Sequence, residues 1–406
     1  MNKTDNRVLG ITDDVKWIGI LDYEIVTFDI VMETEFGTTY NSYFINADKK
    51  AIIETAKAKF SETYINKIKS VCNPSEIEYI ILNHTEPDHS GALKDLLDLA
   101  PEATVVGSGN AIRYLSDMIN IPFRSIAVKD GETLDLGNKT LRFISAPNLH
   151  WPDSIYTYLE EDRILFTCDS FGAHYCDEEM FDDKVADYSD AFKYYFDVIL
   201  KPFSRFMLKA IEKIQSLDID VVCPGHGPIL RSGWKEKVEL SEKYAREYLD
   251  ITKVDKVKKV LITYVSAYGY TKEMAEIIKI GLEGVSDTKV SLLDIENIDL
   301  GELESEVVKA DGILVGSPTI NQNTLLPVYR LFSVINPLRD KNKHAAAFGS
   351  YGWSGEAAGI IADNLRNLKL KVMDDLGKFK FSPDEEKRIE LVAFGSNFAR
   401  QLANCE

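Results

Sequence analysis

From residue 258 onward, short apolar runs alternate with helix-like stretches, and this alternation restricts the fold more than any other feature of the chain. The apolar runs are Val260–Val265, Lys289–Leu293, Gly312–Gly316, Ala345–Phe348 and Lys371–Met373. The helix-like stretches include Lys272–Leu282, Leu326–Ile335, Glu356–Leu368 and Glu385–Ala403. Strands and helices that alternate at this spacing form a parallel sheet covered on both faces. The pattern therefore predicts a doubly wound α/β domain of about 150 residues, a typical domain size.

The preceding part of the chain has a different texture, with short strands and fewer regular helices. Tyr40–Ile45 and Ala51–Thr55 alternate around a turn and predict a hairpin. Further predicted strands are Glu78–Leu82, Leu141–Ser145, Ile164–Thr167 and Val221–Val222, and predicted helices cover Ala92–Leu99, Asp190–Ser216 and Glu236–Leu249. A connector rich in lysine and aspartate follows, so we predict two domains, residues 1–253 and 254–406.

Charge and cysteine usage exclude several classes of protein. The formal net charge is −18, whereas nucleic acids and anionic membranes are bound by clustered lysine and arginine, so neither is expected as a partner. The polar N-terminus has no signal-peptide pattern, and no apolar run approaches the roughly 20 residues of a membrane span. The five cysteines are scattered and form no C-x-x-C pair, which indicates reduced thiols and a cytoplasmic location.

Four possible metal ligands occupy six consecutive positions directly after a predicted strand. They are His84, Glu86, Asp88 and His89, in the segment His-Thr-Glu-Pro-Asp-His. Residues two apart in an extended chain face the same side, so His84 and Glu86 can converge. A turn into the following helix could bring Asp88 and His89 to a neighbouring point.

Three later residues extend this set, each in a loop after a short strand, where loops often carry function. They are His150, Asp169 and His226, the last between Gly225 and Gly227. Any one of the seven taken alone is best explained as a surface or capping residue. Seven together fit two metal ions with one bridging carboxylate, for which Asp169 is the natural candidate.

This ligand pattern resembles the αββα metallo-β-lactamase fold. Its hydrolytic members usually carry histidine where this chain has Glu86, and they bind zinc. A glutamate at this position, together with the doubly wound domain that follows, is a feature in which this chain resembles the flavodiiron proteins. The resemblance covers essentially the whole chain. The resemblance implies that His84, Glu86 and His150 bind one iron, that Asp88, His89 and His226 bind the other, and that Asp169 bridges them. An extra carboxylate suits iron that cycles through the ferric state, whereas zinc has no redox chemistry.

Two further residues resemble family residues beside the diiron site. These are His174 and Tyr195. A hydrogen-bonded interior histidine and a packed aromatic ring explain them equally well from the sequence. A metal-bound histidine usually needs an outer partner, so some residues must fill that role.

Three polar loops follow strands of the C-terminal domain, at the edge where doubly wound sheets bind their ligands. Their candidate residues are Ser266, Tyr268, Gly269, Tyr270, Thr271, Ser317, Pro318, Thr319, Ile320, Asn321, Ser350, Tyr351, Gly352, Trp353 and Gly355. The first loop precedes a helix and can cradle a phosphate, but it matches neither the nucleoside-triphosphate nor the dinucleotide pattern. The three loops together resemble flavodoxin, which implies bound FMN, with Trp353 or Tyr351 stacking on the flavin.

We therefore predict a flavodiiron oxidoreductase that reduces O₂ to water, NO to nitrous oxide, or both. Two ferrous ions and reduced FMN hold the four electrons that O₂ requires. With no rubredoxin-like cysteine module in these 406 residues, electrons are expected from an external carrier such as rubredoxin. Family resemblance also implies a head-to-tail homodimer or a dimer of dimers. The alternatives are a dizinc hydrolase with a vestigial flavodoxin domain and a flavin-holding electron carrier with a vestigial metal domain.

Overall fold

The computed structural model describes residues 7–28, 32–251, 257–285 and 287–403. The chain divides between Tyr248 and Leu249 into two compact units. The predicted boundary between residues 253 and 254 lies outside the described residues. No helix in the described ranges is long and apolar enough to cross a membrane.

The N-terminal unit contains two facing sheets. The larger has the order β1-β2-β7-β8-β9-β10-β11 and the smaller the order β12-β13-β14-β15-β16. Their strands are β1 (Leu9–Gly10), β2 (Val15–Trp17), β7 (Tyr43–Ile45), β8 (Lys50–Ile53), β9 (Ile77–Ile81), β10 (Thr104–Ser108), β11 (Arg124–Val128), β12 (Thr133–Asp135), β13 (Thr140–Ser145), β14 (Ile155–Leu159), β15 (Ile164–Cys168) and β16 (Val221–Pro224). Two short pairs, β3 (Ile20–Asp22) with β6 (Thr38–Tyr40) and β4 (Thr27–Phe28) with β5 (Met32–Glu33), stand apart from them.

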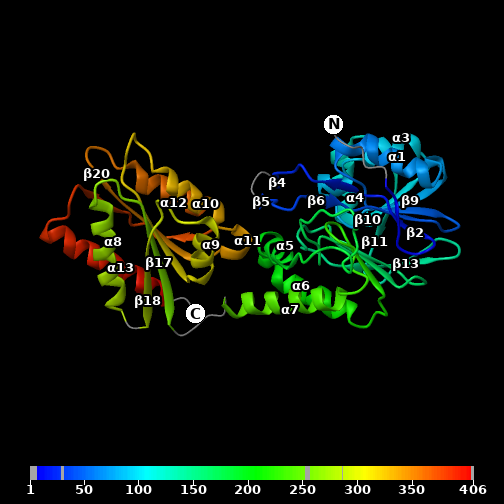
Figure 1. Ribbon diagram of the computed structural model, residues 1–406. Coiled ribbons are helices and arrows are strands. Elements are labelled where there is room, and N and C mark those ends of the chain that lie inside the picture. The colour runs from blue at the N-terminus through cyan, green and yellow to red at the C-terminus, as the bar shows by residue number, and fades with distance from the viewer. Residues whose placement is uncertain (1–6, 29–31, 252–256, 286, 404–406) are drawn as a thin grey trace. The chain divides into compact units, whose positions relative to one another are not determined.

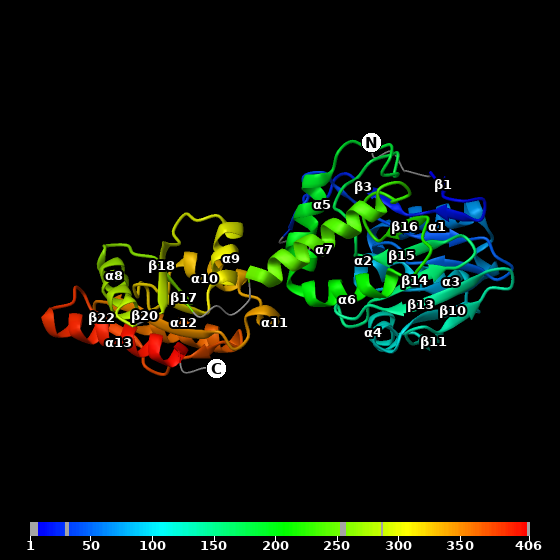
Figure 2. The same cartoon turned by 90° about the horizontal axis from the view of Figure 1, so that it is seen from below.

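One apolar core lies between these sheets and joins Trp17 and Tyr43 of one to Phe143 and Phe166 of the other. The helices cover the outer faces, so the unit has the predicted αββα layers (Figure 2). Those on the larger sheet are α1 (Ser61–Val71), α3 (Leu93–Leu99) and α4 (Gly109–Ile119); those on the smaller are α5 (Ser189–Tyr195), α6 (Ser204–Ile214) and α7 (Trp234–Ile251).

Two predicted elements of this unit differ from the structure. The predicted strand Tyr40–Ile45 is interrupted at Asn41 and Ser42, whose side chains bond to other segments. The helix predicted over Asp190–Ser216 is helical from residue 189 to residue 214 but changes type: α5 continues into a π-helix, Phe196–Leu200, and a 3-10 helix, Lys201–Phe203, before α6. Pro202 lies in that segment and has no N–H to continue the helix. The predicted hairpin is confirmed, because β7 and β8 pair antiparallel.

The C-terminal unit is the predicted doubly wound sheet, with strand order β18-β17-β19-β20-β21 and β22 paired with β20. Its strands are β17 (Lys258–Tyr264), β18 (Thr288–Asp294), β19 (Gly312–Gly316), β20 (His344–Tyr351), β21 (Lys371–Val372) and β22 (Gly377–Lys380), and all pair in parallel. This is the flavodoxin-like order, whose ligands bind at the carboxyl ends of the strands.

Helices cover both faces of this sheet, as Figure 1 shows. On one face are α8 (Tyr270–Glu283) and α13 (Glu385–Ala403), and on the other α9 (Leu300–Lys309), α10 (Leu326–Val334) and α12 (Glu356–Asn367). Alanines of β20 such as Ala346 and Ala347 face the two layers in turn. This alternation is what a strand buried on both sides requires.

Candidate functional site

The seven predicted metal ligands come together where strands of the N-terminal unit end. His84 and Glu86 follow β9, and Pro87 then begins the short helix α2 (Pro87–Ser90), which carries Asp88 and His89. His150 follows β13, Asp169 follows β15, and His226 follows β16. All seven are buried except His150, whose side chain is 20% exposed.

One group of donors surrounds Glu86. Its Oε2 lies 2.9 Å from His150 Nε2 and 3.2 Å from His84 Nε2. Asp169 Oδ2 lies 3.6 Å and 3.7 Å from the same two nitrogens. These four ligand atoms lie within 4.8 Å of one another, close enough to share one metal ion.

A second group surrounds Asp88. Its Oδ2 lies 3.1 Å from His226 Nε2 and 3.5 Å from His89 Nε2. Asp169 Oδ1 lies 3.3 Å from each of these nitrogens. The two carboxylate oxygens of Asp169 therefore face different groups, which is the arrangement of a carboxylate that bridges two cations.

Protons on the imidazoles leave the inner nitrogens as acceptors. His226 Nδ1 lies 2.6 Å from the Thr39 carbonyl, which only accepts, so this nitrogen carries the proton. Nε2 of the neutral ring then has a bare lone pair that faces Asp88, both of whose oxygens lack a hydrogen-bond donor among the described residues. An acceptor that faces acceptors in a buried site needs a cation between them, so these residues fit a metal ion.

Charges in the site support the same reading. Burial lowers the pKa of His226, but the carboxylates of Asp169 and Asp88 outweigh burial and raise it to about 10. Burial opposes ionisation of Asp169 too, yet His89 and His226 hold its pKa well below the usual range. Without metal, imidazolium protons would therefore supply the positive charge that the carboxylates require.

The two predicted neighbours, His174 and Tyr195, lie beside the second group. Tyr195 donates a hydrogen bond from its hydroxyl to Asp169 Oδ1 over 2.9 Å. His174 has Nδ1 2.9 Å from Thr38 Oγ1, and its Nε2 has no hydrogen-bond partner within the described ranges. Burial and the charge of His226 lower the pKa of His174 to about 3, so this ring is neutral at physiological pH.

The predicted flavin loops meet at the carboxyl ends of β17, β19 and β20. Thr271 Oγ1 lies 2.9 Å from Ser350 Oγ, and Ser350 O accepts from Thr319 N over 2.9 Å, so the three loops are tied together. Gly349 permits this approach, because a Cβ there would lie 2.2 Å from the Ser317 carbonyl. Ser317, Thr271 and Ser350 are buried in the loop bases.

Aromatic side chains at these loops extend outward. Tyr268 is 82% exposed and Trp353 is 94% exposed, whereas Tyr351 packs against Gly355. A hollow of about 290 Å³ lies beside Trp353, lined also by Thr319 and Asn321. Large exposed aromatic rings beside a polar hollow are the groups that a planar ring system would cover.

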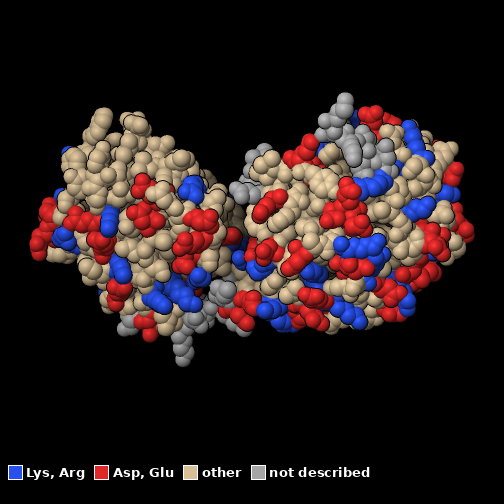
Figure 3. All heavy atoms as spheres, viewed as in Figure 1, with Lys and Arg blue, Asp and Glu red and all other residues tan. Residues whose placement is uncertain are grey.

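Charged residues are absent from the three loops, residues 265–271, 317–325 and 349–355. Figure 3 shows this end of the C-terminal unit as a region almost without lysine, arginine, aspartate or glutamate. A phosphate bound here would be held by hydroxyls, by backbone N–H groups and by the N-terminus of α8, not by a basic side chain.

Comparison with known proteins gives the family. Residues 38–227 match the ODP family beta lactamase model, and residues 262–395 match the flavodoxin model. The chain is 40% identical over 400 residues to a flavo-diiron protein of Clostridium acetobutylicum, across 97% of this chain and 99% of the relative. The chain belongs to the flavodiiron protein family. A type A flavoprotein of Rhodobacter capsulatus is 36% identical across 97% of this chain and 91% of its own length.

Solved structures agree with this assignment. The rubredoxin oxygen:oxidoreductase of Desulfovibrio gigas superposes with a TM-score of 0.70 at 29% identity, covering 98% of each chain. The flavodiiron protein of Giardia intestinalis gives 0.67 at 30% identity, covering 98% of this chain and 97% of its own. The predicted family, both folds and both cofactors of this flavodiiron protein, FMN and a diiron centre, are thereby confirmed.

Sequence reasoning missed Asp153, an outer partner of the metal centre. This fully buried carboxylate accepts from Thr85 N over 2.8 Å and from Thr85 Oγ1 over 2.7 Å, and both its oxygens lie 3.2 Å from His84 Nδ1. The contact places the proton of His84 on Nδ1 and leaves Nε2 for metal. The sequence offers only the general rule that a metal-bound histidine needs an outer partner, and this rule does not single out Asp153 among the carboxylates of the chain.

Replacing Asp153 with asparagine should weaken iron binding by about 10- to 100-fold, the usual effect of losing an outer partner. Thr85 N–H would draw the new amide oxygen, so the amide nitrogen would face His84 Nδ1 and favour the proton on Nε2. Iron titration monitored by bound iron per chain measures the effect. Asp98→Asn, exposed on α3, is the control and should bind iron normally. If Asp153→Asn binds iron with unchanged affinity, Asp153 does not act by fixing the tautomer of His84.

Glu54 and Cys168 form another group with His89 near this centre. Burial raises the pKa of Glu54 to about 8, and burial with the charge of Asp169 raises that of Cys168 well above its usual value. Both side chains are therefore largely protonated at neutral pH and do not compete as charged ligands. The four described cysteines, including Cys168, form no disulfide.

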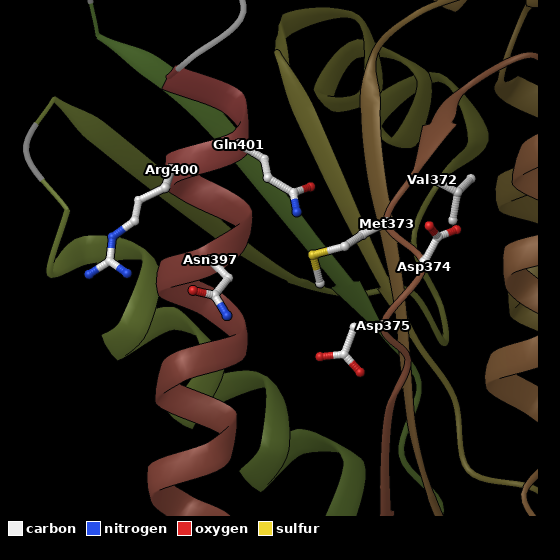
Figure 4. A pocket seen from close by; sticks show the side chains of 7 residues that line it. All are labelled: Val372, Met373, Asp374, Asp375, Asn397, Arg400 and Gln401. Atoms are coloured by element: carbon white, nitrogen blue, oxygen red, sulfur yellow. The ribbon is translucent and has the colours of Figure 1, made fainter.

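A separate cleft of about 440 Å³ lies in the C-terminal unit between α13 and the segment after β21 (Figure 4). Asp374, Asp375 and Arg400 line it together with two amide side chains. Val372 pairs with Ala345 near the start of β20, so the cleft lies toward the sheet end opposite the flavin loops. None of its residues belongs to the predicted sites.

Proposed function

We propose that this flavodiiron protein reduces O₂ to water, NO to nitrous oxide, or both, at a diiron centre held by the seven predicted ligands. The proposal depends chiefly on the position of Asp169. One of its carboxylate oxygens faces the Glu86 group and the other faces the Asp88 group. A pair of redox-active metals can bind a diatomic molecule between them and supply electrons to it. FMN in the second unit would replace those electrons.

The chain's own residues position and tune the centre. Tyr195 donates to Asp169 Oδ1 and so fixes the bridging carboxylate beside the second group. His174 offers a buried, neutral imidazole whose Nε2 has no donor or acceptor opposite it in the described structure, so it can hydrogen-bond a small bound molecule. Reduction of O₂ consumes four electrons and four protons, and two NO consume two of each to give N₂O and water.

Electron supply and assembly complete the proposal. Rubredoxin or a similar small carrier would reduce the FMN, in line with the name of the Desulfovibrio gigas neighbour. A head-to-tail homodimer, or a pair of such dimers, would bring the flavin of one chain to the diiron site of another. Sedimentation of the FMN-loaded protein as a monomer would contradict the dimer, and failure of reduced rubredoxin to bleach the flavin in stopped flow would contradict that donor.

The activity is tested by offering O₂ and NO separately to the reduced, iron- and FMN-loaded protein. We expect O₂ consumption without accumulation of H₂O₂, or one N₂O for each two NO consumed, or both. Zinc-loaded protein of the same FMN content is the control, because zinc cannot exchange electrons. If the iron-loaded chain leaves both gases untouched, or only forms H₂O₂ at the rate of the zinc-loaded control, the proposed function is wrong.

The flavin site gives a separate prediction. Trp353→Ala should weaken FMN binding by roughly 2- to 10-fold, the effect of losing one aromatic stacking contact. Ile389→Ala, an exposed apolar side chain of α13 outside the three loops, is the matched control. Flavin fluorescence during titration of FMN-free protein measures both constants. Equal affinity for Trp353→Ala and the control would exclude stacking by Trp353.

A further inference from the structure

The loop that carries His226 is held from one side by residues 39–43 of the chain. His226 is the third residue of Pro224-Gly225-His226-Gly227, and its ring nitrogen Nδ1 bonds to the carbonyl of Thr39 over 2.6 Å. Thr39 Oγ1 accepts from Gly227 N over 2.8 Å. The His226 ring and the loop backbone are therefore both hydrogen-bonded to Thr39, a residue of β6.

Asn41 makes the larger share of these contacts. Its Nδ2 donates to Pro224 O and to Gly227 O, each over 2.9 Å, and its backbone N donates to Gly225 O over 2.9 Å. Asn41 thus donates to three of the four carbonyls of the loop, and it shares one of them, Pro224 O, with the Tyr43 hydroxyl, which donates to it over 2.7 Å. The fourth, that of His226, accepts from Ala173 N over 3.3 Å.

The orientation of the Asn41 amide is fixed by its partners. Trp17 Nε1 can only donate and lies 2.9 Å from Asn41 Oδ1, while the two loop carbonyls can only accept. The Asn41 side chain is completely buried, so water cannot replace any of these three bonds. Gly19 makes room for the arrangement, because a Cβ there would lie 2.7 Å from Trp17 Nε1 and 2.9 Å from Asn41 Cα.

Movement of this loop would reach the metal ligands directly. Gly225 N donates to Cys168 O over 2.5 Å, next to Asp169, and a Cβ on Gly225 would lie 2.6 Å from His89 Cε1. The loop therefore packs without spare room against two other ligands of the second group. A displacement of a few tenths of an ångström changes the distances among His226, His89 and Asp169 together.

We propose that Asn41 is a positioning residue for the Asp88–His89–His226 half of the metal centre. Its two amide N–H groups fix the position of the Pro224–Gly227 loop relative to the other ligands. Trp17 fixes the orientation of the amide itself by donating to Asn41 Oδ1. The proposal rests on His226 being an iron ligand, as in the proposed function. It assigns Asn41 no contact with metal or substrate; the residue acts through the loop that presents the imidazole.

Asn41→Asp tests the role of the two N–H groups. The variant keeps the shape of the side chain but places a carboxylate oxygen opposite two carbonyl oxygens, so the loop should be pushed away. In an Fe(II) titration we expect the affinity for the iron at the Asp88–His89–His226 group, here called the second iron, to fall at least tenfold. The EPR spectrum of the half-reduced diiron centre should also change. FMN content should stay unchanged, since the flavin loops belong to the other unit.

Ser42→Ala is the matched control. Ser42 is equally buried, and its hydroxyl bonds to Glu54 O over 2.8 Å and to Tyr64 OH over 2.8 Å, away from the His226 loop. It should lose thermal stability without a change in the affinity of either iron or in the EPR spectrum. If Asn41→Asp does not yield folded protein, Asn41→Ser is used in its place. Serine keeps one hydrogen-bond donor, so this variant should lower the affinity for the second iron only.

The outcomes separate this proposal from the proposed function. The proposal is overturned if the Asn41 variant binds both iron ions with unchanged affinity, keeps its EPR spectrum and shows only a lower melting temperature. Asn41 would then be a structural residue. If the unsubstituted chain itself fails to bind two iron ions, the failure belongs to the proposed function. Weakening of both irons to the same extent would also overturn the assignment to one half of the centre.

Discussion

Asp169→Ala should lose both iron ions, whereas removal of a ligand from one group should lose mainly one. Asp169 is the one predicted ligand with an oxygen toward each group, at 3.3 Å from His89 and His226 and at 3.6 Å and 3.7 Å from His150 and His84. Without it, two sets of carboxylates and imidazoles remain with no shared anion between their cations. Iron analysis of purified protein should fall from about two per chain toward zero.

The same variant should change the product of O₂ reduction. Reduced FMN alone delivers two electrons, so O₂ should be converted slowly to H₂O₂, whereas the proposed function has the intact centre form water. Glu86→Ala provides the comparison for loss of one group, and Asp98→Asn, exposed on α3, the comparison for a surface carboxylate. An Asp169→Ala chain that retains two irons and forms no H₂O₂ would be incompatible with a bridging role.

Removal of iron should make stability strongly dependent on pH between about 6.5 and 10. In the metal-free chain the charge of the carboxylates is balanced by protonated imidazoles, and the pKa of His226 is raised from 6.5 to about 10. A raised pKa in the folded state contributes stability that is complete below the unfolded value and is lost as pH rises through the folded value. His84 and His89 are shifted in the same direction.

The expected fall in the melting temperature of the chelator-treated protein from pH 6.5 to pH 10 is on the order of 10 °C, because a loss of several kcal/mol shifts a domain of this size by about 2–4 °C per kcal/mol. Iron-loaded protein is the control: its imidazoles are already neutral ligands, so its melting temperature should change much less. Equal pH dependence with and without iron would mean that imidazolium protons do not replace the metal charge.

Much of the fold follows from periodicity in the sequence. Gly312–Gly316 is a buried strand in the structure as predicted, because a run of five apolar residues between turn signals has few other solutions. The interruption at Asn41 was not predictable, since the pattern Tyr40–Ile45 alternates like a strand. Only the tertiary bonds of Asn41 and Ser42 to distant segments explain why the strand stops there.

The site divides in a similar way. Potential ligands such as His84 and Glu86 can be predicted because metal binding restricts residue types and places them close together in sequence or at strand ends. Asp153 and Asn41 could not be selected in this way, because a buried carboxylate or amide has no sequence pattern of its own. Their positions become meaningful only when His84 and the His226 loop are seen beside them.

Anomalous diffraction at the iron edge, from crystals of the protein reconstituted with Fe(II) and FMN, tests the central claim most directly. We expect two iron atoms in each N-terminal unit, one bound to each oxygen of Asp169, with Glu86 on the first and Asp88 on the second. A single iron atom, or a pair that Asp169 does not bridge, would contradict the assignment of this chain as a diiron oxidoreductase.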